Sequence, residues 1–354
     1  YMPVINNNDI LESIEDLKQF GLKKLKQCKV IYIDNESLGT FPELKSGGFA
    51  FVCHVEDSYT KTQYALRVWH TKPDNDDFME RSKILSNYIS KYNSTTYIVN
   101  YEYLQNSLIV ANSKQDVLLM DWIAGKTLFK FLNDICETNS QNARNQIRQI
   151  ARRFKDMAKW MHSKQIAHGD LQHDNIIIKD NGDIVLCDYD SMYVPGMENF
   201  DQITTGYEGY QHPLRKQYSP RKMDKKDDYF SEIIIYLGLL ILSMSTIFWD
   251  HEESNEQYFI FDIKELDKIK HDIPFQKLSD IFTLKCKDKE DDFVMSEIRQ
   301  LLKLLRDNLN CSSLDSIKPI PGLDSFYCCQ CSAELFPVYQ FCPYCGSRIK
   351  HSIL

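Results

Sequence analysis

Three oxygen-bearing side chains are spaced in the sequence in a way that suits phosphate chemistry. In the segment HGDLQHDNIII, Asp170 precedes Asn175 by five positions, and Asp188 follows Asn175 by thirteen. The set supplies one base and two hard oxygen donors, which phosphoryl transfer from a Mg-nucleotide requires. For each residue alone, a place in a turn or a helix cap is the favoured interpretation, because Asp and Asn are common there. The ordered set favours the catalytic interpretation.

These segments resemble the catalytic loop and metal-binding motif of the protein-kinase superfamily, H-R-D-L-x-x-x-N and D-F-G. The resemblance implies that Asp170 accepts the proton of the attacking hydroxyl, and that Asn175 and Asp188 hold Mg²⁺ (or Mn²⁺). Gly169 replaces the arginine that pairs with a phosphorylated activation loop. Gln172 replaces the lysine of most Ser/Thr kinases, so Mg²⁺ and other groups must meet the transition-state charge.

Upstream, the segment KSGGFAFV resembles a nucleotide-covering glycine loop, and YALR follows at the spacing of the superfamily's V-A-I-K. Arg67 stands in the lysine position, where its planar fork differs from an ammonium in reach and geometry. Glu80 is the expected partner of Arg67, with Glu56 as the alternative. The resemblance assigns ATP binding to Gly47, Gly48, Phe49, Val52, Ala65, Arg67, Glu80, Met120, Asp121 and Trp122. Met120 ends an apolar strand, and Asp121-Trp122-Ile123 is the expected hinge beside adenine.

A nearly unbroken apolar run extends from Phe230 to Trp249, long enough to span a bilayer. Such a run is either a membrane helix or a helix in the core of a large domain. It begins with DYFS, which resembles the D-x-W-S pattern that opens the central helix of the large lobe in kinases. The resemblance implies that Asp228 binds backbone amides of the catalytic loop and that the run is core.

Two C-x-x-C pairs near the C-terminus have the spacing of a metal site. Cys328 and Cys331 form one pair, Cys342 and Cys345 the other, and ten residues separate them. Four thiolates can surround Zn²⁺ tetrahedrally, with Gly346 letting backbone amides approach sulfur, whereas a redox dithiol needs one pair only. The segment resembles a zinc ribbon with a closed, structural site.

The elements that must position these residues change character along the chain. Strand patterns occupy 30–33, 49–56, 64–69, 97–104 and 117–122, with a helix at 74–92 and an amphipathic helix from about residue 10 to 27. Past residue 125 long helices dominate, with one hairpin whose Asn-Gly dipeptide at 181–182 predicts a type I′ turn. We therefore expect an α+β, bilobal protein-kinase-like fold, with a small β-rich N-lobe, a large helical C-lobe and a zinc ribbon.

The expected organisation is an N-terminal helical extension (1–37), the kinase N-lobe (38–124), the C-lobe (125–319) and the zinc ribbon (320–354).

With 42 basic and 50 acidic residues the net charge is −8, so neither nucleic acid nor an anionic membrane is an expected partner. The first residues lack the apolar run of a signal peptide, and six of the eleven cysteines follow residue 310, which together favour a reducing cytoplasm.

The expected function is transfer of the γ-phosphate of ATP to Ser/Thr hydroxyls of a protein substrate. A pseudokinase scaffold that binds nucleotide and partners is the first alternative, because Arg67, Gln172 and Asp190 depart from the motifs. A small-molecule kinase of the aminoglycoside or choline type is the second, because HGD is common there. HGDLQH, DYDxM and YQHP resemble a bacterial Ser/Thr kinase subgroup, which implies a phosphatase and a von Willebrand A-type protein as partners.

Overall fold

The computed structural model divides into two compact units, residues 1–124 and 125–354, each described in turn. The residues it describes are 9–10, 12–13, 28–35, 39–46, 50–69, 76–92, 97–110, 112–217, 219–249, 257–323, 326–327, 334–335, 341–342 and 344–348. Residues 9–10 and 12–13 are helical, and the rest of the predicted N-terminal helix lies outside the described residues.

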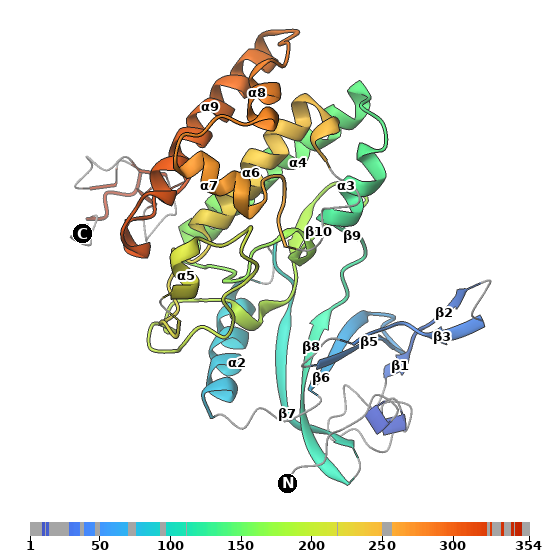
Figure 1. The fold of residues 1–354 in the computed structure, drawn as a ribbon. Helices are drawn as coiled ribbons and strands as arrows, with labels where there is room; N and C mark the ends of the chain where they lie inside the picture. The colour runs from blue at the N-terminus through green and yellow to red at the C-terminus, as the bar shows by residue number, and fades with distance from the viewer. Residues whose placement is uncertain are drawn as a thin grey trace. The chain divides into compact units, whose positions relative to one another are not determined.

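The first unit is built on an antiparallel sheet of order β1-β5-β6-β8-β7, in which β4 also pairs with β5 (Figure 1). A separate hairpin joins β2 to β3, and α2 packs against β7. The elements are β1 (Cys28–Val30), β2 (Tyr32–Asn35), β3 (Gly39–Pro42), β4 (Leu44–Ser46), β5 (Ala50–Asp57), β6 (Gln63–Trp69), α2 (Asp76–Ile89), η3 (Ser90–Tyr92), β7 (Tyr101–Val110) and β8 (Ser113–Asp121).

Alternation of side chains along the strands gives this sheet its core. Cys53, Leu66 and Leu119 lie opposite one another on three neighbouring strands, and each is at most 1% exposed. Because successive strand residues face opposite sides, the residues between them, such as Ala65 and Arg67, lie on the less buried face. The predicted strand at 30–33 is in fact divided, because the chain leaves β5 after Val30 and pairs with β3 from residue 32.

The second unit is largely helical and has α6 (Tyr229–Met244) at its centre. Every residue of α6 is buried, and the helix packs against α4 and α9 (Figure 1). The prediction of a core helix is therefore confirmed, although it ends at Met244, where Ser245 takes an extended conformation before η6. Within the described ranges, no helix combines the length and the apolar character that crossing a bilayer demands.

The second unit contains further helices and short strands. They are β9 (Lys126–Thr127), α3 (Leu128–Cys136), α4 (Gln141–Lys164), η4 (His173–Asn175), β10 (Ile176–Ile178), β11 (Ile184–Leu186), η5 (Tyr189–Ser191), α5 (Pro213–Gln217), η6 (Thr246–Phe248), α7 (Ile263–Lys270), α8 (Gln276–Phe282), α9 (Lys289–Leu309), η7 (Leu314–Ser316), β12 (Phe326–Tyr327) and β13 (Glu334–Leu335). Strands β9, β10 and β11 form a small antiparallel sheet, and β12 pairs with β13.

The hairpin between β10 and β11 corrects the predicted turn. A type I′ turn needs a positive φ at both central residues, but Gly182 has a φ of +80° and Asn181 is not among the positive-φ residues of the described chain. Lys179 and Asp183 close a loop of three residues, in which the Gly182 amide donates to the Lys179 carbonyl at 2.8 Å. A three-residue loop takes a left-handed glycine at its last position, so the glycine was needed but the turn type differs.

Candidate active site

The segment that carries Asp170 connects α4 to β10. It is held by Asp228, the residue that precedes the first turn of α6. The carboxylate of Asp228 accepts hydrogen bonds from the amides of His168 and Gly169, the latter at 2.9 Å. Burial raises the pKa of Asp228 to about 6, and the Glu232 carboxylate acts in the same direction, while His168 and the two amide bonds oppose it. The loop is thereby tied to the most deeply buried helix of the unit.

Gly169 is required by the backbone. Its φ is +78°, and a Cβ built on it would lie 2.1 Å from the carbonyl oxygen of Ser191. No residue with a side chain fits without moving that backbone, so the absence of the family's arginine here has a steric cause. The Gly169 carbonyl instead accepts a hydrogen bond from Arg215 of α5, a guanidinium that is 3% exposed and also binds Gln202 and Gln211.

The carboxyl group of Asp170 is half-buried and lies beside Gly206. A Cβ on Gly206 would lie 3.0 Å from Asp170 Oδ1 and 3.0 Å from Gln211 Nε2. Both atoms are buried without a hydrogen-bond partner among the described residues, and so is Gln172 Oε1. Burial raises the pKa of Asp170, and Asp188 adds to this, whereas His168 and Arg215 oppose it. Unpartnered buried polar atoms are rare, and a cluster of them is expected where a ligand supplies the missing partners.

Asn175 and Asp188 each carry a side-chain oxygen and stand on two neighbouring segments. The Asn175 side-chain amide donates to the Asp170 carbonyl at 2.8 Å, which leaves Asn175 Oδ1 as an acceptor. Asp188 is exposed and has a φ of +60°, two residues after the end of β11. The Cys187 amide donates to the Asn175 carbonyl at 3.0 Å, so the backbone holds the two segments together. An oxygen-only donor set fits Mg²⁺ or Mn²⁺ rather than a thiophilic metal.

In the first unit, the structure brings four predicted nucleotide-binding residues onto one face of the sheet. Val52 pairs with Arg67 across β5 and β6, and Ala65 pairs with Met120 across β6 and β8. Residues directly opposite one another, and residues two apart on one strand, share a face. Val52, Ala65 and Arg67 are half-buried, and Met120 is 8% exposed. These four residues therefore combine apolar surface with the cation of Arg67.

Gly47, Gly48 and Phe49 lie outside the described residues. Glu80 is exposed on α2, and no ion pair joins it to Arg67 in the part of the chain that is described.

The expected hinge begins at Asp121, which is the last residue of β8 and pairs with Tyr64 of β6. The Trp122 amide donates to the Gln63 carbonyl at 3.0 Å. The Trp122 ring stacks on His54 with 3.7 Å between the ring centroids. The amide and the ring of Trp122 are therefore both engaged within the first unit.

Arg215, Gln211 and Gly206 are the residues at this site that sequence reasoning missed. They lie between η5 and α6, in the segment GYEGYQHPLR, which has no periodic pattern of apolar residues. Arg215 is followed by Lys216, so the pair is easily taken for a solvated helix face. Only the motif YQHP within this segment signalled that it is more than a loop.

Of the four predicted zinc ligands, Cys342 and Cys345 are described and Cys328 and Cys331 are not. Cys342 is buried, its carbonyl accepts from the Gly346 amide at 2.9 Å, and its sulfur accepts from the Tyr344 amide at 3.4 Å. Gly346 has a φ of +72°. Among the described residues, no three or more His, Cys, Asp or Glu side chains are grouped so that they could hold a metal ion.

A β-sheet unit followed by a helical unit, with a carboxylate loop anchored on a buried helix, is the arrangement of an α+β phosphotransferase. The sequence matches the protein kinase domain over residues 39–311, and the chain belongs to that family.

Curated relatives carry the same domain at low identity. The chain is 24% identical over 214 residues to a probable serine/threonine-protein kinase of Dictyostelium discoideum, which is 59% of this chain and 18% of that protein. It is 25% identical over 150 residues to serine/threonine-protein kinase 1 of Heliothis zea nuclear polyhedrosis virus, 42% of this chain and 52% of the relative. A MAP kinase kinase of Saccharomyces cerevisiae is 23% identical over 214 residues, 59% of this chain and 38% of the relative. The matched regions thus cover about half or less of each of these proteins.

Proposed function

We propose that this protein is an ATP- and Mg-dependent kinase that transfers the γ-phosphoryl group to Ser/Thr hydroxyls of proteins. The observation that carries the proposal is the carboxyl group of Asp170, whose buried Oδ1 has no partner among the described residues, on a loop anchored by Asp228. An acceptor hydroxyl placed there would donate to this oxygen. The raised pKa makes Asp170 a stronger base than a solvated carboxylate once it is deprotonated.

The remaining residues have supporting roles in this proposal. Asn175 Oδ1 and the Asp188 carboxylate would hold Mg²⁺, which when bound neutralises charge on the phosphates. Arg67 would form ion pairs with the phosphates of ATP. Its adenine ring would pack against Val52, Ala65 and Met120. Asp228 and Arg215 keep the loop in one shape and touch neither substrate.

The direct test is phosphate transfer from labelled ATP with Mg²⁺ or Mn²⁺, to the chain itself and to a generic protein acceptor. Asp170→Asn should lower the transfer rate about 100-fold or more, because general base catalysis is lost while the shape is kept. Exposed Asp267→Asn is the matched control and should leave the rate unchanged. Transfer that survives Asp170→Asn contradicts the proposal, and ATP binding without any transfer favours the pseudokinase scaffold instead.

We also propose that Cys328, Cys331, Cys342 and Cys345 bind one structural Zn²⁺. The supporting observation is the turn at Cys342, in which an amide donates to sulfur and a left-handed glycine follows the second cysteine. Both cysteine pairs fall in the connections of short antiparallel segments, one between β12 and β13, the other inside the bridge that joins Phe341 to Arg348. Zn²⁺ would supply the folding free energy that so small a module cannot obtain from its core.

We also expect a cytoplasmic location, because the first residues lack the apolar run of a signal peptide and the cysteines gather at one end of the chain. Motif resemblance predicts membership of the bacterial subgroup, with a phosphatase and a von Willebrand A-type protein as partners. Co-purification of the chain with such partners from its own cells would test them.

A further inference from the structure

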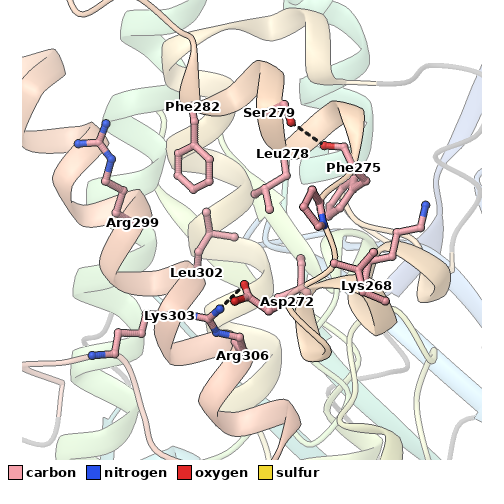
Figure 2. Close-up of a pocket in the computed structure, with 13 residues that line it drawn as sticks. Lys268, Asp272, Phe275, Leu278, Ser279, Phe282, Arg299, Leu302, Lys303 and Arg306 are labelled. Atoms are coloured by element: carbon pink, nitrogen blue, oxygen red, sulfur yellow. Dashed lines mark hydrogen bonds and ion pairs between the residues drawn. The ribbon is translucent and has the colours of Figure 1, made fainter.

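A groove in the second unit lies between α7, α8 and α9 and belongs to none of the machinery described above (Figure 2). Its volume is about 380 Å³, within the range of binding pockets for organic ligands. The floor is apolar and is formed by Ile269, Phe275, Leu278, Phe282 and Leu302. Apolar surface gathered in one hollow is the usual basis of recognition.

The rim of the groove is cationic. Arg299 and Lys303 extend from α9 on one side, and Lys268 lies on the other (Figure 2). The one carboxylate that lines the groove, Asp272, is already paired with Arg306. No ion pair engages Lys268, Arg299 or Lys303 within the described ranges. A rim with three such cations stands out on a chain whose net charge is −8.

The groove is also open to solvent along its floor. Phe282 is 42% exposed, and Ile273 at its edge is 48% exposed. A hydrocarbon chain in such a groove would remain partly wet, whereas a peptide would seat one or two apolar side chains and keep its backbone in water. Carboxylates that flank those side chains would then meet the rim, as charge complementarity requires.

We propose that this groove binds an acidic peptide segment of a partner protein, with apolar side chains on the floor and carboxylates against Lys268, Arg299 and Lys303. The inference does not depend on phosphoryl transfer, since the groove shares no residue with the loop that carries Asp170.

The probe for the test is a fluorescein-labelled peptide, Gly-Asp-Glu-Leu-Asp-Asp-Leu-Phe-Asp-Gly, titrated with the full chain at low ionic strength and followed by anisotropy. Arg299→Glu combined with Lys303→Glu should weaken binding about tenfold or more, because two attractive contacts become repulsive. Lys264→Glu with Lys285→Glu makes the same change in net charge at exposed positions outside the groove, and should weaken binding less than about twofold. A peptide with Ser in place of Leu and Phe should also bind about tenfold more weakly, because the floor is left uncovered.

If another molecule occupied the groove, the experiments would give different results. Equal weakening by the two double variants would show that net charge alone attracts the peptide, and would overturn the proposal. Binding of laurate in place of the peptide would assign the groove to a lipid anion, and self-association abolished by the groove variant would assign it to a second copy of this chain. Either result overturns the proposal. Thermal unfolding of both variants checks that they fold, and peptide binding by a chain that transfers no phosphate would leave this proposal intact while the proposed function fails.

Discussion

Gly169 joins two constraints at one residue, a left-handed backbone and a carbonyl oxygen 2.1 Å from where a Cβ would lie. Gly169→Ala should cost about 1–2 kcal/mol for the backbone, and about 1–3 kcal/mol more for the forced contact. Gly322→Ala is the matched control, because Gly322 also has a positive φ but nothing lies within 4 Å of its Cβ position. Urea unfolding of both variants measures the difference. Equal losses would mean that the Ser191 carbonyl yields easily.

The buried carboxyl of Asp228 should give stability a distinctive pH dependence. Its pKa is about 6 in the folded chain, against an ordinary value of 3.8. The folded state therefore binds more protons between these pH values, and the contribution of Asp228 to stability falls as pH rises through this window, by about 3 kcal/mol in all.

Asp228→Asn removes this dependence. The stability of the native chain relative to this variant should decline from about pH 4 to about pH 6 and stay constant above it. Urea unfolding at a series of pH values measures it, with exposed Asp267→Asn as the control. A constant difference across the whole range would contradict a raised pKa for Asp228.

At the scale of elements, η4 is held against the segment before α5 by one buried polar contact. The Tyr210 hydroxyl is hydrogen-bonded to His173 Nδ1, and the two rings stack with 5.4 Å between centroids. Burial lowers the pKa of His173 to about 4, so the ring is neutral at pH 7, although Asp174 opposes this. Phe259 and Phe129 pack around the pair.

Tyr210→Phe should destabilise the chain by about 1–3 kcal/mol, because it leaves the His173 nitrogen buried without its partner. It should also lower the rate of transfer, since η4 contains Asn175 as its last residue. Tyr59→Phe, at a side chain that is 79% exposed, should change stability by less than about 0.5 kcal/mol. Denaturant unfolding and transfer rates of both variants make the comparison. Unchanged values for Tyr210→Phe would deny the contact a structural role.

Elements defined by local patterns were predicted well, and contacts between distant segments were not. The apolar run that became α6 and the alternating residues of β6 follow from hydrophobic period alone. The bond from Arg215 to the Gly169 carbonyl spans 46 residues, and no local pattern marks it. The Asn-Gly dipeptide located the hairpin but gave the wrong turn type. The number of loop residues decides the turn type, and the dipeptide alone does not determine that number.

On the scale of the whole molecule, the cysteine module should depend on metal. Purified protein should contain about one zinc per chain, and Cys342→Ser should lose it, because three thiolates bind Zn²⁺ less tightly than four. Cys286→Ser, at an exposed cysteine far from the pairs in sequence, should keep it. Elemental analysis by mass spectrometry gives the ratio. A chain that lacks zinc but keeps the turn at Cys342 would contradict the zinc ribbon.

Arg215 has a consequence for how such an enzyme can be governed. The positive charge that holds the loop is the Arg215 guanidinium, which is part of the same chain and is buried. This positive charge belongs to an arginine side chain and depends on no phosphate group. A phosphatase therefore cannot remove it. We expect the loop to take its working shape once, as the chain folds, and to keep it for the life of the molecule.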